Sequence, residues 1–179
     1  MAKKAKGRDQ RHVAPPLHTP TDLKPKAVQA ISKALNAVLA DTFALFVKTK
    51  NFHWHISGPN FRGYHLMLDD HAAELITTID EVAERVRKIG GVTIRSVGEI
   101  ARLKSIKDNE AEFVAPGDML IELMEDNKLA IEGMRKAHGV CDDHDDVAGA
   151  SQLENFIDQA EKRCWFLFES SRNEDRTGH

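Results

Sequence analysis

The segment that decides the fold is FRGYHLMLDDHAAELITTIDEVAERVRKIGG, residues 61–91. Its apolar residues recur three or four positions apart, which is the period of a helix with one buried side. Gly90-Gly91 ends this pattern because glycine is a poor helix former. The segment therefore predicts a long amphipathic helix over residues 61–89, and its apolar stripe is Phe61, Tyr64, Leu68, Leu75, Ile79, Val82, Val86 and Ile89.

Three further segments show the same helical period: residues 27–51, 116–138 and 146–171. A turn is expected over His53–Asn60, because Gly58-Pro59 stops any helix there. Residues 94–103 predict a short helix within a long crossover. Four long amphipathic helices with no strand-like alternation predict an all-α four-helix bundle with a short extra helix in the crossover between the second and third helices.

Length and composition indicate one domain in this chain of 179 residues, and we place it at residues 26–172. The segment 1–25 is rich in proline and predicts a flexible tail, and residues 173–179 form a short second tail. No apolar run approaches a membrane span, and no apolar stretch follows the charged N-terminus as in a secretory signal. Two cysteines, Cys141 and Cys164, cannot build a disulfide framework, so we expect a cytoplasmic protein.

Positive charge gathers at the N-terminus. The whole chain carries a formal net charge of −3, but its first eleven residues carry about +4, which leaves about −7 on the remainder. A basic tail on an acidic body is a candidate for non-specific DNA binding, and the alternative is a tail that only aids solubility. The candidate DNA-binding residues are Lys3, Lys4, Lys6, Arg8 and Arg11.

Metal-ligating side chains share one face of the predicted helix 61–89. At about 100° per residue, His65, Asp69, Asp80 and Glu84 lie within about 100° of one another. The apolar stripe is centred near 290° on the same scale, where His65 is at about 0°. This face therefore does not point into the chain's own core.

The face holds two pairs that cannot meet within one helix. His65 and Glu84 lie roughly 28 Å apart at 1.5 Å per residue, whereas a metal ligand lies about 2 Å from its ion. Two antiparallel copies of the helix about a two-fold axis would bring His65 and Asp69 of one chain to Asp80 and Glu84 of the other. Small and apolar residues between the pairs suit that contact: Ala73, Ile76 and Thr77.

Other patterns narrow the chemistry. A single His–carboxylate pair is more often a solvated helix face, but two pairs that flank an apolar patch favour a metal site. The neighbouring stripe Asp70, Glu74 and Glu81 predicts either a solvated acidic face or a surface that collects cations. No Glu-x-x-His motif is present, which disfavours a di-iron centre or a di-metal oxygenase site inside the bundle.

Three motifs resemble the Dps family, the DNA-binding proteins from starved cells or mini-ferritins: NFHW at 51–54, GPNFRGYHLMLD at 58–69 and IDEVAER at 79–85. The resemblance implies a ferritin-like four-helix bundle that assembles into a hollow shell of twelve subunits. It also implies a ferroxidase site between two-fold related subunits, which agrees with the spacing of the two pairs.

The resemblance assigns ligands residue by residue. His53, His65 and Asp69 would come from one subunit, and Asp80 and Glu84 from its partner. These donors suit Fe²⁺ and also admit Zn²⁺, Mn²⁺ or Co²⁺. The site would oxidise Fe²⁺ to Fe³⁺, with hydrogen peroxide preferred over O₂. Trp54 would lie beside the site, where it either takes up oxidising equivalents or packs.

The resemblance also implies an acidic three-fold pore near residue 146 and mineral growth inside the shell. The pore candidates are Asp142, Asp143, Asp145 and Asp146, one of which is expected to cap the last helix. Ser151 departs from the family, which commonly has a further Asp there. The nucleation candidates are Asp70, Glu74 and Glu81.

The leading prediction is a cytoplasmic, nucleoid-associated iron-oxidising and iron-storing mini-ferritin that protects DNA from oxidative damage. Twelve basic tails on one shell would also bind DNA multivalently. The alternative is mainly a nucleoid-packing DNA-binding protein with weak ferroxidase activity. No membrane partner is expected.

Overall fold

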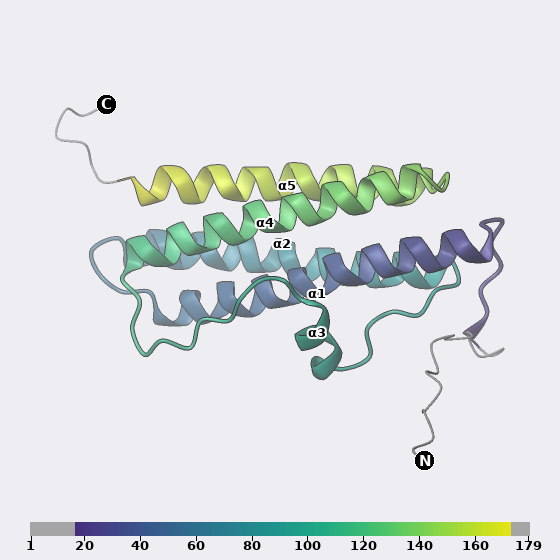
Figure 1. Cartoon of the computed structure of the whole chain (residues 1–179). Coiled ribbons are helices and arrows are strands. Elements are labelled where there is room, and N and C mark those ends of the chain that lie inside the picture. The colour runs from purple at the N-terminus through teal and green to yellow at the C-terminus, as the bar shows by residue number, and fades with distance from the viewer. Residues whose placement is uncertain (1–16, 173–179) are drawn as a thin grey trace, which may run out of the picture.

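The computed structural model describes residues 17–172, and within that range the chain forms five helices and no strand. The four long helices lie side by side as a bundle, and the short one lies outside it against the first (Figure 1). This arrangement confirms the predicted bundle with its extra helix in the crossover. In chain order the helices are α1 (Pro25–His55), α2 (Phe61–Lys88), α3 (Val97–Leu103), α4 (Pro116–Asp142) and α5 (Val147–Ser171).

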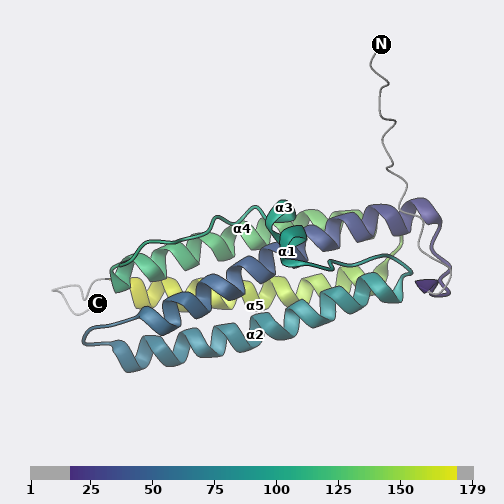
Figure 2. The same cartoon turned by 90° about the horizontal axis from the view of Figure 1, so that it is seen from below.

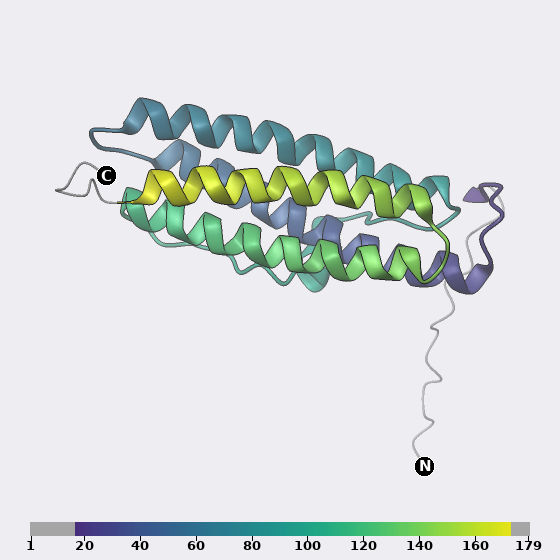
Figure 3. The same cartoon turned by 90° about the horizontal axis from the view of Figure 1, so that it is seen from above.

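Two antiparallel pairs make up the bundle, α1 with α2 and α4 with α5. The crossover between the pairs carries α3 and runs back along the length of the bundle, so α2 and α4 point the same way (Figure 2). Seen from above, α5 lies beside both α2 and α4 (Figure 3). One long crossover is the connection found in ferritin-like bundles.

The first helix ends later than its sequence predicts. We expected a turn from His53 onward, but α1 continues to His55, and the amide of Ile56 still donates to the carbonyl of Phe52 at 2.8 Å. Nothing between Asn51 and His55 breaks a helix. The helix ends at its C-cap Ile56, whose ψ of 144° is extended, and Gly58 then turns the chain with a φ of 95°, a left-handed conformation that favours glycine. His53 is therefore held on a rigid helix.

The predicted apolar stripe of α2 forms its buried side. Leu68, Leu75, Ile79, Val82 and Val86 are all 6 % exposed or less. Phe61 was expected to belong to this stripe but is 45 % exposed. It lies in the first turn of α2, next to the ring of His65.

Buried polar contacts fix the crossover and α4 to α1. The carboxylate of Asp41 accepts hydrogen bonds from the amides of Ser105 and Ile106 at 2.5 and 3.0 Å. The buried ammonium of Lys48, on α1, contacts Asp126, on α4, at 2.5 Å. Because a buried charge is costly without a partner, these contacts specify how α1, α4 and the crossover fit together.

One described helix, α1, is long and apolar enough by length and composition to cross a membrane. The core helix of a bundle passes the same test, and α1 packs against α2, α3 and α4. Its apolar character is explained by the side chains that it buries: Ile31, Leu35, Leu39, Leu45 and Phe52.

A buried polar network links α2, α4 and α5. Arg163 is 1 % exposed and donates to Asn127 at 2.9 Å and to Glu74 at 3.1 Å. His71 lies beside this network and is 7 % exposed. Burial, and then the positive charge of Arg163, lower the pKa of His71 to about 4. His71 is therefore neutral in the folded chain at neutral pH.

This depressed pKa predicts a loss of stability in mild acid. Between pH 6.5 and 4 the unfolded chain binds a proton at His71 that the folded chain does not, so stability is full above that window and falls as the pH falls. We expect a loss of about 2 kcal/mol between pH 7.5 and 5 from this residue. Chemical unfolding at matched protein concentration measures it. His71→Gln should flatten the pH dependence, whereas the exposed control His55→Gln should keep it.

Candidate metal centre

Two histidines meet where α1 ends and α2 begins. The Nδ1 atom of His53 donates to the carbonyl of His65 at 2.9 Å, and the Nδ1 atom of His65 donates to the carbonyl of His53 at 2.9 Å. Their rings are stacked, with centroids 3.8 Å apart. A carbonyl only accepts, so Nδ1 carries the hydrogen in each ring and Nε2 is left as the metal-binding atom of the neutral imidazole. The reciprocal bonds therefore orient both rings as ligands.

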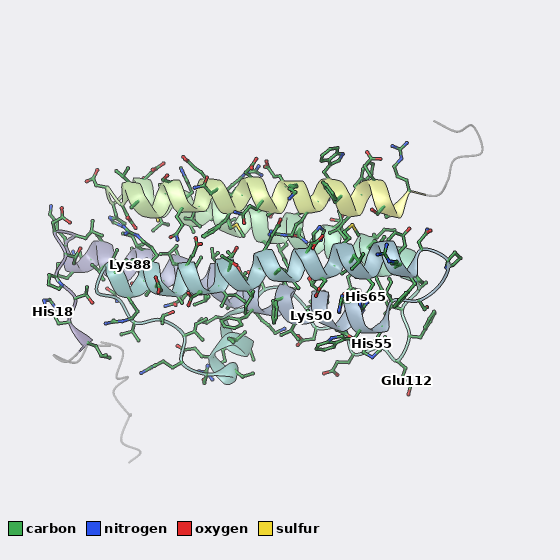
Figure 4. The ribbon with its side chains drawn as sticks, turned by 180° about the vertical axis from the view of Figure 1, so that it is seen from behind. His18, Lys50, His55, His65, Lys88 and Glu112 are labelled. Atoms are coloured by element: carbon green, nitrogen blue, oxygen red, sulfur yellow. The ribbon has the colours of Figure 1, made fainter. Side chains whose placement is uncertain are left out.

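Asp69 adds an oxygen to this pair. It lies one turn after His65, and its Oδ1 atom is 3.8 Å from Nε2 of His53. The ammonium of Lys50 hydrogen bonds to the same Oδ1 atom at 2.8 Å, which lowers the pKa of the Asp69 carboxyl. Figure 4 shows Lys50 and His65 near the same end of the bundle. We call His53, His65 and Asp69 the histidine half-site.

Asp80 and Glu84 lie farther along the same helix, on exposed positions one turn apart. Glu84 pairs with Lys88 at 2.9 Å, and both side chains of that pair are more than half exposed. Figure 4 shows Lys88 toward the opposite end of the bundle from His65. We call Asp80 and Glu84 the carboxylate half-site.

The two half-sites do not meet within one chain. No group of three or more His, Cys, Asp or Glu side chains among residues 17–172 is placed to hold a metal ion. Between the half-sites, Ala73, Ile76 and Thr77 are exposed, and Ile76 is 47 % exposed. The prediction that this face of α2 points away from the chain's own core is therefore confirmed.

Two aromatic side chains lie near the histidine half-site. Trp54 is 65 % exposed, and the ammonium of Lys50 lies 5.9 Å from its ring centroid. The ring of Phe61 lies 5.0 Å from that of His65. The helical period placed Phe61 in the core, so its role beside His65 was missed.

The second acidic stripe divides into two exposed carboxylates and one that is paired with two cations. Asp70 and Glu81 are exposed, and Glu81 accepts a hydrogen bond from Gln152 at 3.4 Å. Glu74 is half-buried, with one oxygen 3.2 Å from Lys162 and the other 3.1 Å from Arg163. Burial raises the pKa of the Glu74 carboxyl, but the hydrogen bonds from Arg163 and Lys162 outweigh it and lower that pKa. Glu74 is therefore a structural carboxylate, and the expectation that it collects cations is corrected.

The acidic turn between α4 and α5 also divides. Asp142, Asp143 and Asp145 are exposed. Asp146 is 1 % exposed, accepts from the amide of Gly149 at 3.0 Å and pairs with Arg85. The expected cap of the last helix is confirmed, but Asp146 cannot line a pore because its carboxylate is committed inside the fold.

One further contact near this turn was missed. His138 lies between two carboxylates, with Nδ1 3.3 Å from Asp142 and Nε2 3.1 Å from Glu154. The contact between His138 and Glu154 joins α4 to α5, so no spacing pattern within one helix could have predicted it. The basic residues predicted to bind DNA, residues 1–16 of the predicted N-terminal tail and the C-terminal tail lie outside the described residues. Residues 17–24 are described, and the carbonyl of Leu17 accepts a hydrogen bond from Arg87 at 2.6 Å.

Comparison with known proteins identifies the family to which this fold belongs. Residues 32–175 match the family model of the ferritin-like domain. The DNA protection during starvation protein of Brevibacillus brevis is 32 % identical over 145 residues, which cover 81 % of this chain and 97 % of that protein. DNA protection during starvation protein 2 of Bacillus anthracis is 31 % identical over 137 residues, or 76 % of this chain and 93 % of that one.

A solved structure shows the same fold. DpsC from Streptomyces coelicolor superposes with a TM-score of 0.84 and 29 % sequence identity, over 87 % of this chain and 91 % of that one. The family match covers well over half of the sequence, and the relatives are matched along most of their length. The chain therefore belongs to the Dps family of ferritin-like proteins.

Proposed function

We propose that this protein oxidises Fe²⁺ at sites shared by two subunits and stores the Fe³⁺ product inside a shell of twelve subunits. One observation supports this most directly: His65 with Asp69, and Asp80 with Glu84, lie apart along one face of α2, with an exposed apolar patch between them, and the buried His53 joins the first pair from α1. The two pairs are too far apart to hold one ion within a chain. An antiparallel pair of α2 helices about a two-fold axis would complete two sites at once.

Each completed site would combine both half-sites. The histidine half-site of one subunit, His53, His65 and Asp69, would face Asp80 and Glu84 of the other subunit. Imidazole nitrogens and carboxylate oxygens together suit Fe²⁺, and the same donors admit Zn²⁺, Mn²⁺ and Co²⁺. Nδ1 of each histidine is already held by a carbonyl, so the site would bind Fe²⁺ without reorienting either ring.

The proposed reaction consumes two Fe²⁺ ions for each hydrogen peroxide. Each Fe²⁺ gives up one electron, and the peroxide takes both electrons and two protons to become two waters. Transfer of two electrons releases no hydroxyl radical, which accounts for protection of DNA. The preference for peroxide over O₂ rests on the family resemblance. Trp54, exposed beside the site, is the candidate for taking up stray oxidising equivalents.

Two exposed acidic surfaces are candidates for the path of iron. Asp142, Asp143 and Asp145 would give an entry pore a negative potential that attracts cations. Asp70 and Glu81 remain candidates for nucleating the ferric mineral, whereas the paired Glu74 does not.

If Asp80 and Glu84 are iron ligands, their removal should slow iron oxidation. Anaerobic Fe²⁺ followed by peroxide should give fast oxidation in the wild type, and Asp80→Ala/Glu84→Ala should slow it at least about tenfold, since the partner's ligands are lost. Stopped-flow absorbance of ferric iron measures the rate. The control Asp118→Ala/Glu132→Ala removes two exposed α4 carboxylates and should keep the wild-type rate. Equal oxidation rates in all three proteins would show that Asp80 and Glu84 on α2 do not take part in iron oxidation.

Sharing between subunits predicts complementation. His65→Ala and Asp80→Ala each disable every site when assembled alone. In a shell reassembled from equal amounts, about half of the two-fold contacts pair one variant with the other, and one of the two sites in each such contact is intact. About one-quarter of the wild-type ferroxidase activity should return on that basis. Unassembled mixtures serve as the control, and no recovery in mixed shells would show that the ligands are not shared.

DNA binding by the basic tail is a second function that we propose, in a cytoplasmic protein associated with the nucleoid. The charge of about +4 on the first eleven residues, against about −7 elsewhere, favours it. The names of the relatives record DNA protection.

Multivalent binding through tails makes a direct prediction. Deletion of residues 1–11 should abolish the DNA mobility shift and leave iron oxidation intact, because the body alone is acidic. Electrophoretic mobility shifts at two salt concentrations measure it, and the wild-type shift should weaken steeply with salt. Unchanged binding by the deletion variant would assign DNA contact to the bundle surface instead.

A further inference from the structure

The ammonium of Lys50 is hydrogen bonded to a carboxylate oxygen of Asp69, one of the proposed metal ligands. The ammonium of Lys50 lies 2.8 Å from Oδ1 of Asp69, the same atom that is 3.8 Å from Nε2 of His53. Lys50 is on α1, three residues before His53, so the two side chains are displaced by about one helical turn. A metal ion held between Nε2 of His53 and Oδ1 of Asp69 would compete with this ammonium for the same oxygen.

Lys50 is held at this position on two sides. Its side chain is 20 % exposed, and its ammonium lies 5.9 Å from the ring centroid of Trp54, within the range of a cation–π contact. Among the described residues its one ion-pair partner is Asp69. The contact is therefore built by α1, which positions both the lysine and the tryptophan.

The pair at the carboxylate half-site provides a contrast. Lys88 contacts Glu84 at 2.9 Å, but their side chains are 59 % and 57 % exposed, and the two residues are one turn apart on one helix. Such solvated pairs contribute little and rearrange freely. Lys50 instead reaches Asp69 across two helices from a partly buried position. The Asp69 and Glu84 side chains are both 57 % exposed, so the two pairs differ in the burial of the lysine and not in that of the carboxylate.

We propose, on the basis of the shared site above, that Lys50 is an internal competitor of the metal for Asp69. In the empty site its ammonium occupies the carboxylate, and an arriving divalent cation must displace it. This competition lowers the affinity for Fe²⁺. The displaced ammonium remains tethered near the ion, where it repels Fe³⁺ more strongly than Fe²⁺ because Coulomb repulsion grows with charge. Lys50 therefore favours release of the ferric product from the site.

Binding of the redox-inert ion Zn²⁺ tests this proposal in the full-length assembled protein. Isothermal titration calorimetry should show that Lys50→Met binds Zn²⁺ about tenfold more tightly than the wild type, equivalent to about 1.4 kcal/mol. Lys50→Arg keeps the charge and should stay within about threefold of the wild type, since the competing cation remains. The matched control Lys88→Met removes the same charge from the solvated pair and should change the affinity less than about twofold.

Three outcomes would overturn the proposal. The first is an equal increase in Zn²⁺ affinity in Lys50→Met and Lys88→Met, which would indicate a general effect of net charge. The second is an increase in Zn²⁺ affinity in Lys50→Arg as large as in Lys50→Met. The third is an unchanged Zn²⁺ affinity in Lys50→Met. Asp69→Ala separates this result from the proposed function: if it abolishes Zn²⁺ binding while Lys50→Met does nothing, the shared site stands and the competition fails. If Asp69→Ala binds as the wild type does, the proposed site itself fails. Lys50→Gln replaces Lys50→Met if the latter does not assemble.

Discussion

The structure depends on one constraint: α2 must bury one side in its own bundle and keep another side open. The buried stripe includes Leu75 and Ile79, and the open face carries Asp69 and Asp80. Adjacent residues are about 100° apart on a helix, so a slip of one residue would move carboxylates toward the core and leucines toward water. The core therefore fixes the direction in which the proposed ligands on α2 point, before any metal or second subunit is present.

The helical spacing of apolar residues was enough to predict the bundle and the open face of α2. It did not predict the partners of the charged side chains. Lys50 and Asp69 lie on different helices, and Glu74 and Arg163 are joined across 89 positions of the chain. A period says which face a residue is on, whereas the reach of a long lysine or arginine depends on how the helices are placed. For the same reason the sequence left Glu74 among the cation-collecting residues, although two cations already hold it.

The acidic turn shows a second limit of the sequence. Asp142, Asp143, Asp145 and Asp146 are chemically equal, and any of them suits a helix N-cap. The backbone chooses among them: Asp146 directly precedes Val147, the first residue of α5, and turns inward to meet Arg85, while the other three remain exposed. The count of acidic residues predicted exposed carboxylates at this turn, but only the position of the first helical turn identifies which of the four is buried.

The lysines that pair with the proposed ligand carboxylates also affect how two subunits could assemble without iron. In the proposed arrangement, each two-fold contact gathers six carboxylates, from Asp69, Asp80 and Glu84 of both chains. Unscreened, such a cluster would oppose assembly, because like charges in a partly desolvated interface repel strongly. Lys50 and Lys88 of both chains offset four of the six charges. The lysines would thus allow the empty site to assemble while leaving a net negative charge that still attracts Fe²⁺.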